Sequence, residues 1–362
     1  MSGDTALTLT LSLSLNEKFY GCICGAHIGS SMGAIVEGWP YDAVESKYGT
    51  LEELLPYEHY GNGWTRDPGT TEDGVERQKL MITAIMKKND RVNAEDVRSV
   101  WRTEIKVDAP GNVSEPFEGE LLAIAKSKIP ARDIGKYCDY AGLNSFARAC
   151  HPIGLINAGD PGSALEDALE VGQLYQTSNS RGLQWACVTA VAIASATKPG
   201  STVDSVIQDI YKYCDRHVAN EIESGLKLTE NCKDFRDLRK VFDPVYNGVG
   251  MPYCMSFANE VVTKSICVFK LVNGDVKQAI ISGVNLGRDT DCITAIAAGI
   301  SGALTGAGSI PELWIEQVDS ATKVNPYTNT QRTMRENSDG LYSAFKSRLD
   351  KAKEYYDKMY DV

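Results

Sequence analysis

Residues 287–304, GRDTDCITAIAAGISGAL, join a polar beginning to a long apolar run. The apolar residues recur at helical spacing, so the run predicts a buried helix. Asp289 and Asp291 come directly before that helix, with a threonine between them. Acidic and hydroxyl side chains in this place are also ordinary helix caps. The stretch therefore indicates either a cap or a group of metal ligands.

A second cluster of similar composition, Thr70-Thr71-Glu72-Asp73-Gly74, runs into a predicted helix over residues 76–87. Carboxylates and hydroxyls are hard oxygen ligands, which suit Mg²⁺, Mn²⁺ or Ca²⁺ better than zinc or copper. The structural alternative is again a cap, because Asp73 and Glu76 have the spacing of a capping box. Spacing alone does not establish that the two clusters meet in space.

Glycine recurs at every fourth position within and directly after a predicted helix over residues 18–32, and this spacing places the glycines on one helix face. They are Gly21, Gly25, Gly29 and Gly33. Each glycine within a helix costs about 1 kcal/mol relative to alanine, so another interaction must offset it. The simplest interpretation is close packing against a second helix.

Helical periodicity dominates the rest of the chain, and no strand–helix alternation appears. Further helices are predicted over residues 163–176, 183–197, 256–272 and 341–359. In the last of these we expect the apolar residues to face inward, namely Leu341, Phe345, Leu349, Ala352, Tyr356 and Met359. Residues 60–73 and 221–252 are predicted to be loops. We therefore predict a single all-α domain over residues 17–362, preceded by a flexible tail over residues 1–16.

Composition narrows the function classes. The net charge of −11 argues against nucleic acid or an anionic membrane as a partner. No run of about 18 residues is continuously apolar, and the first 16 residues lack the basic and apolar regions of a signal peptide. The ten cysteines are scattered and form no CxxC pair, which favours a reducing, cytoplasmic location. The four histidines are far apart in sequence, so a zinc site is not expected.

Four segments of the chain form an ordered set of motifs: residues 25–38 (GAHIGSSMGAIVEG), 71–73 (TED), 151–161 (HPIGLINAGDP) and 287–307, with Ile310, Pro311 and Trp314 beyond. In this order they resemble the ADP-ribosylglycohydrolase family, which includes dinitrogenase-reductase-activating glycohydrolases, ADP-ribosylarginine and ADP-ribosylserine hydrolases, and J1 crystallins. The resemblance extends over roughly residues 18–314.

The resemblance implies an orthogonal helical bundle with two Mg²⁺ ions, or Mn²⁺, in a central cleft. The implied metal ligands are Thr71, Glu72, Asp73, Asp289 and Asp291. The implied catalytic residues are Glu37, Glu72 and Asp73. The implied phosphate loop, which would bind the substrate, contains Gly142, Asn144 and Ser145.

These groups suit cleavage of a bond at the anomeric carbon of a ribosyl group. Positive charge develops at that carbon in the transition state. A metal fixes the sugar hydroxyls and activates water, and a carboxylate transfers a proton. We expect Glu72 or Asp73 to act on the water and Glu37 to act as a gate or as an acid and base.

The chain departs from the family pattern at several positions. Glu72 replaces an aspartate, and Cys292 replaces a hydroxyl residue with a soft thiol that suits Mg²⁺ poorly. Residues 174–179 lack the histidine that many members use for ligand contact, and Arg148 is offset by one position from their usual arginine. The metal-binding part of the pattern is thus kept better than the part that recognises ADP.

Three functions follow from this pattern. The first is hydrolysis of an ADP-ribosyl adduct, on a protein or free. The second is hydrolysis of a smaller N-riboside or nucleoside. The third is a non-catalytic, crystallin-like or ligand-binding role. The five oxygen ligands of the two clusters argue against the third, and we favour the first.

Overall fold

The computed structural model describes residues 13–58, 63–106, 122–138, 140–247 and 255–360, and this part of the chain is predominantly helical. Two short strands, β1 (Tyr57–Glu58) and β2 (Thr65–Arg66), pair antiparallel with Tyr57 opposite Arg66. The described helices are α1 (Leu15–Gly33), η1 (Ala34–Val36), α2 (Tyr41–Tyr48), α3 (Asp73–Lys88), α4 (Ala94–Glu104), α6 (Ala131–Ile134), η2 (Gly135–Tyr137), α7 (His151–Ile156), α8 (Pro161–Val171), η3 (Gly172–Leu174), α9 (Arg181–Ala196), α10 (Val203–Tyr213), α11 (Arg216–Leu228), α12 (Phe235–Phe242), α13 (Ala258–Leu271), α14 (Val276–Val284), α15 (Thr290–Thr305), α16 (Glu312–Thr322) and α17 (Met334–Tyr360). The all-α prediction is confirmed.

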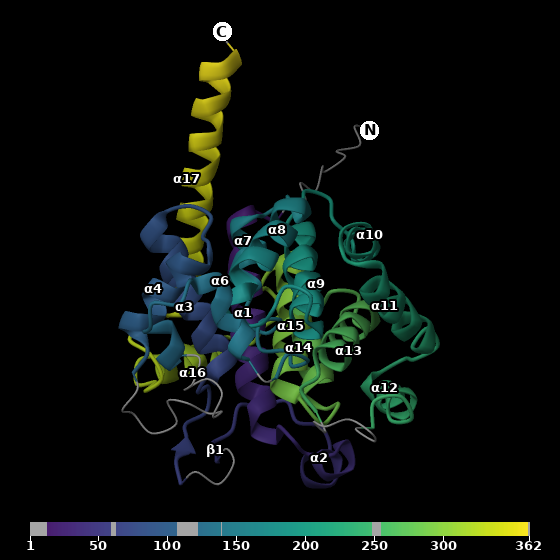
Figure 1. Cartoon of the computed structure of the whole chain (residues 1–362). Coiled ribbons are helices and arrows are strands. Elements are labelled where there is room, and N and C mark those ends of the chain that lie inside the picture. The colour runs from purple at the N-terminus through teal and green to yellow at the C-terminus, as the bar shows by residue number, and fades with distance from the viewer. Residues whose placement is uncertain (1–12, 59–62, 107–121, 139, 248–254, 361–362) are drawn as a thin grey trace, which may run out of the picture.

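Helices α1 and α15 lie at the centre of the bundle and run antiparallel to each other (Figure 1). The glycines of α1 face the backbone of α15. A Cβ atom at Gly25 would lie 2.6 Å from the carbonyl carbon of Ala298, and one at Gly33 would lie 2.5 Å from the Cα of Asp291. Real Cβ atoms do not come so close, so only glycine permits this approach. The predicted close packing is confirmed.

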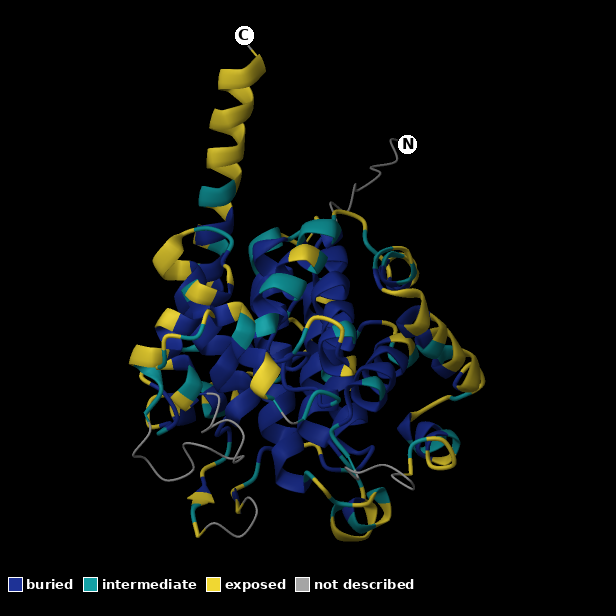
Figure 2. Ribbon diagram, in the orientation of Figure 1, coloured by how far each residue is buried: buried dark blue, intermediate teal, exposed yellow. Residues whose placement is uncertain are grey.

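The remaining helices surround this central pair. Helices α9, α13 and α14 pack against α15, whereas α3, α16 and α17 pack against α1. The residues of the central helices are almost all buried (Figure 2), and their hydrophobic side chains form one cluster. This single core favours one domain, although the domain boundaries stay a prediction. The predicted boundary at residue 17 falls within α1, which begins at Leu15, and residues 1–12 of the predicted tail lie outside the described residues.

Residues Leu15–Val36, which comprise α1 and η1, are long and apolar enough to cross a membrane by length and composition. In this fold, however, 94% of the most apolar window in that segment is buried inside the protein. The segment therefore occupies the place of a core helix.

The prediction of a loop over residues 221–252 is wrong. Helix α11 extends to Leu228, and α12 lies wholly within the range. Both helices are amphipathic: in α12, Phe235, Leu238 and Phe242 are buried and the charged residues between them mostly face outward. The high charge of the segment concealed this narrow apolar stripe. Residues 248–252 of the range lie outside the described residues.

The expectation for the C-terminal helix is half right. Leu341 and Phe345 of α17 are buried as predicted. Leu349, Tyr356 and Met359 are exposed, because the second half of α17 extends beyond the body of the protein (Figures 1 and 2). An apolar stripe indicates which face of a helix is apolar, but not whether another element covers it.

Candidate active site

The polar turn before α15 is held by backbone contacts with the segment that follows α1. The Arg288 amide donates to the Trp39 carbonyl at 2.8 Å, and the Gly38 amide donates to the Arg288 carbonyl at 2.8 Å. Gly287 and Arg288 both have positive φ, 75° and 66°, a conformation that glycine adopts freely. Together these contacts fix the direction in which Asp289 leaves the turn.

Two side-chain contacts support the same turn. The Arg288 guanidinium donates to both oxygens of Glu260 on α13, at 2.6 and 2.8 Å. The Thr290 hydroxyl donates to the carbonyl of Gly33 at 2.7 Å. The first residues of α15 are therefore fixed to α13 on one side and to α1 on the other.

Asp289 and Asp291 are almost completely buried, at 1% and 2% exposure. Asp289 is the N-cap residue of α15, yet its side chain makes no capping hydrogen bond. One ligand atom from each of Asp289, Asp291 and Cys292 lies within 4.8 Å of the others. Asp289 therefore does not act as a side-chain cap, and its carboxylate lies close to that of Asp291. The assignment of Asp289 and Asp291 as metal ligands stays a prediction.

The charge at this cluster is poorly compensated by protein groups. The Asn144 amide donates to Asp289 Oδ2 at 2.9 Å, but the Oδ1 atoms of Asp289 and Asp291 are buried without a hydrogen-bond partner. Burial, followed by the charges of Glu37 and Asp289, raises the pKa of Asp291 well above its ordinary value. Two converging carboxylate oxygens without partners fit one divalent cation. Burial also raises the pKa of the Cys292 thiol well above its ordinary value.

Arg148 joins the second cluster to the first. Its Nη2 donates to Oδ2 of Asp73 at 2.5 Å, and its Nη1 donates to the Cys292 sulfur at 3.6 Å. Asp73, at the start of α3, therefore lies beside the N-terminus of α15. The sequence alone did not assign Arg148 to the site. The one indication in the sequence was that Arg148 lies one position away from the arginine that is usual in the family.

Glu72 has other partners. Its carboxylate accepts hydrogen bonds from the hydroxyls of Tyr57 and Tyr327, at 2.6 and 2.5 Å, and forms a short ion pair with Arg66. Burial and the Glu72 charge raise the pKa of Tyr57 well above its ordinary value. Glu72 is the N-cap residue of α3, but it makes no capping bond.

Thr71 likewise makes contacts within the protein. Its hydroxyl donates to Glu76 Oε1 at 2.7 Å, and Lys79 lies 3.2 Å from the same hydroxyl. Glu76 is therefore engaged with Thr71 and Lys79, and the capping box expected from Asp73 and Glu76 is not formed. The assignment of Thr71 and Glu72 as metal ligands stays a prediction, and so does a catalytic role for Glu72.

The predicted phosphate loop lies beside the aspartate cluster. Asn144 contacts Asp289, as described, and its backbone amide donates to the Ser256 carbonyl at 3.0 Å. Ser145 is buried, and the Gly142 carbonyl accepts from the amide of Ala258 at 2.9 Å. The loop is thus anchored to the N-terminus of α13, and substrate binding by these residues stays a prediction.

Glu37 follows η1 and is half-buried. Its charge is near enough to raise the pKa of both Asp291 and Cys292. Because it is more accessible than the aspartates, Glu37 is the acidic side chain of this cluster that is best placed to exchange protons with solvent.

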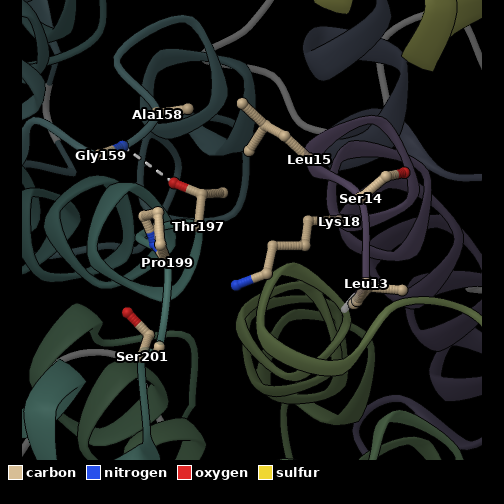
Figure 3. A pocket seen from close by; sticks show the side chains of 10 residues that line it. Leu13, Ser14, Leu15, Lys18, Ala158, Gly159, Thr197, Pro199 and Ser201 are labelled. Carbon is tan, nitrogen blue, oxygen red and sulfur yellow. Dashed lines mark hydrogen bonds between the residues drawn. The ribbon is translucent and has the colours of Figure 1, made fainter. Parts of the chain in front are cut away.

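A cavity of about 570 Å³ lies elsewhere, between the beginning of α1 and the ends of α7 and α9 (Figure 3). Lys18 reaches into this region and donates to the carbonyls of Ala196 and Lys198 at 2.8 and 3.2 Å. Lys18 and Gly33 are separated by 15 helical residues, or about 22 Å along the axis. This cavity is therefore distinct from the aspartate cluster, which lies at the other end of α1.

Comparison with known proteins identifies the family. The sequence model of the ADP-ribosylglycohydrolase family matches residues 11–348. This chain belongs to the ADP-ribosylglycohydrolase family. It is 23% identical to ADP-ribosyl-[dinitrogen reductase] glycohydrolase of Rhodospirillum rubrum, over 84% of this chain and 92% of the relative. It is 24% identical to the uncharacterised protein YegU of Escherichia coli, over 85% of this chain and 94% of the relative.

Its fold is similar to that of a protein from a solved ADP-ribosylglycohydrolase-related protein complex, with a TM-score of 0.65 and 15% identity. That match covers 92% of this chain and 98% of the other. The predicted family and fold class are confirmed, and the protein is an ADP-ribosylglycohydrolase-like hydrolase. A central cleft that holds metal stays a prediction.

Proposed function

We propose that the protein is a Mg²⁺-dependent hydrolase that cleaves the bond between the anomeric carbon of an ADP-ribosyl group and its acceptor. The observation that carries this proposal is the pair Asp289 and Asp291, which are buried close together and each have one carboxylate oxygen without a hydrogen-bond partner. Family membership supports the reaction class, and the Rhodospirillum rubrum relative is named for an ADP-ribosyl substrate.

The chain's own residues suit such a reaction. Asp289 and Asp291 would hold the cation, and the Asn144 amide would orient Asp289. A divalent cation supplies a Lewis acid, which orients oxygen ligands and stabilises developing negative charge. Glu37, half-buried beside the cluster, would transfer the proton between water and the leaving group. Asp73, whose charge is offset by Arg148, would accept a hydrogen bond from the attacking water and orient it.

One observation favours a smaller riboside as a second candidate substrate. Gln176 lies in the segment where many relatives have a ligand-contacting histidine. Its amide donates to the carbonyls of Tyr140, Ala141 and Leu143, at 3.2, 3.3 and 3.0 Å. Gln176 therefore braces the loop instead of facing a ligand, so one contact to the ADP portion is missing.

A substrate panel tests both candidates. The protein is incubated with Mg²⁺ and ADP-ribosyl-arginine, ADP-ribosyl-serine, NAD⁺ or nucleosides, and the released ribosyl product is followed by chromatography. Release from an ADP-ribosyl compound supports the first candidate and identifies the linkage. Release from nucleosides alone supports the second, and no release from any compound would contradict both and favour the non-catalytic role.

A further inference from the structure

The guanidinium of Arg148 lies between the two acidic clusters in the protein interior. The Arg148 side chain is 8% exposed, and that of its partner Asp73 is 9% exposed. A second contact runs from Arg148 to the thiol of Cys292 at 3.6 Å. A fixed positive charge thus lies where the family resemblance leads one to expect a metal ion near Asp73.

We propose that this protein holds one divalent cation, at Asp289 and Asp291, and that the guanidinium of Arg148 takes the place of a second cation beside Asp73. The inference rests on the metal dependence proposed above. It replaces the expectation of two ions and assigns Arg148 as a positioning residue.

The expected ligands of a second ion are engaged elsewhere. Glu72 is held by Arg66, Tyr57 and Tyr327, and the Thr71 hydroxyl is held by Glu76 and Lys79. Cys292 offers a sulfur atom, which is soft and therefore a poor ligand for hard cations such as Mg²⁺ and Mn²⁺. Asp73 alone remains from the first cluster, and its carboxylate already accepts from Arg148 at 2.5 Å.

The position of Arg148 is built into the fold. A Cβ atom at Gly74 would lie 2.9 Å from Cδ of Arg148, so glycine at this position makes room for the arginine side chain. The Arg148 carbonyl is held by the Gln78 amide at 2.7 Å, which fixes the backbone beneath it. A second cation would either displace the guanidinium from a buried carboxylate or lie beside it, and like charges repel strongly in a buried site.

The test uses Mn²⁺ alone as the probe and needs no substrate. Equilibrium dialysis gives the number of ions bound, and electron paramagnetic resonance distinguishes an isolated ion from a coupled pair. We expect one Mn²⁺ per chain and the six-line spectrum of an isolated ion. Two tightly bound Mn²⁺ ions with a spin-coupled spectrum would overturn the proposal.

Four variants separate the roles of the residues. Asp291→Asn should weaken Mn²⁺ binding at least roughly 100-fold. Asp73→Asn should keep one Mn²⁺, with affinity within about threefold of the unchanged protein, whereas a loss comparable to that of Asp291→Asn would refute the proposal. Arg148→Met frees the Asp73 carboxylate, so a second Mn²⁺ should bind, more weakly than the first because Asp73 is the one ligand that the first cluster then offers. Arg148→Lys should restore the count to one. A count of one in Arg148→Met would also contradict the proposal.

Arg91→Met serves as the matched control, because Arg91 pairs with Asp167 at 2.7 Å outside the site. It should bind one Mn²⁺. The outcome is independent of the substrate: one bound Mn²⁺ without hydrolysis would refute the proposed function alone, and hydrolysis with two bound ions would refute this inference alone.

Discussion

Replacing Gly33 with alanine should damage both the fold and the cation site, because this glycine contacts α15 where the aspartates begin. The added Cβ would lie 2.5 Å from Asp291 Cα, whereas ordinary contact begins at 3.4 Å, so the backbones must separate by about 0.9 Å. Both sides of the contact are backbone or Cβ atoms, so a change of side-chain rotamer cannot relieve it.

The expected change in the free energy of unfolding of Gly33→Ala is the difference between destabilising and stabilising contributions. Overpacking costs about 1–3 kcal/mol, and the hydrogen bond from Thr290 to the Gly33 carbonyl, worth about 1 kcal/mol, would be strained. In the other direction, alanine has a higher helix propensity than glycine, which stabilises the folded state by at most about 1 kcal/mol. We therefore expect the free energy of unfolding to fall by about 1–3 kcal/mol. Because Asp291 moves by nearly 1 Å, Mn²⁺ affinity should fall at least about tenfold.

Urea unfolding and Mn²⁺ titration measure the two effects on the same preparation. Gly162→Ala is the matched control, since a Cβ there would meet its nearest atoms at 3.5 Å, which is ordinary contact. That variant should leave both quantities nearly unchanged. If Gly33→Ala keeps the free energy of unfolding within about 0.5 kcal/mol of that of the unchanged protein, which is the range of a neutral substitution, and also keeps the Mn²⁺ affinity, the account of the α1–α15 contact is refuted.

Three further outcomes are expected from urea unfolding. Burial lowers the pKa of His151 from 6.5 to about 4, so the neutral side chain contributes fully to the free energy of unfolding above pH 6.5, and this contribution is lost as the pH falls toward 4. His151→Leu should therefore remove about 3 kcal/mol of the dependence of stability on pH. An unchanged profile of stability against pH would contradict the assignment. Glu72→Gln should lower the free energy of unfolding by about 3–5 kcal/mol because Arg66 loses its buried partner, whereas a loss below about 1 kcal/mol would show that the ion pair is unimportant. A chain ending at Lys351 should be as stable as the full chain within about 0.5 kcal/mol, since residues 352–360 are exposed; a larger loss would show that they pack against the body.

Local patterns in the sequence predicted much of the fold. The four-residue glycine period places its members on one helix face, which is enough to predict a close helix contact. The glycine spacing does not indicate which other helix makes the contact. Charge was less informative, since it hid the apolar stripe of α12, and the apolar stripe of α17 did not show that half of it lies outside the body.

The candidate site was only partly predictable for a similar reason. Adjacent acids such as Asp289 and Asp291 can be recognised as a unit in the sequence, and the structure brings Asp73 beside them. The partners of Glu72 come from Tyr57 and Tyr327, which are 15 and 255 positions away along the chain. Contacts over such separations depend on the tertiary fold, so a single sequence cannot show that Glu72 is engaged or that Arg148 reaches Asp73.

The most direct test of the central claim is the release of free ADP-ribose from an ADP-ribosylated arginine or serine compound, measured for the unchanged protein and for Asp291→Asn. We predict release that requires a divalent cation, is stopped by EDTA, and is absent from Asp291→Asn although the variant remains folded by circular dichroism. Equal release by the variant, or release that persists in EDTA, would contradict the assignment of Asp289 and Asp291 as the centre of a metal-dependent hydrolase.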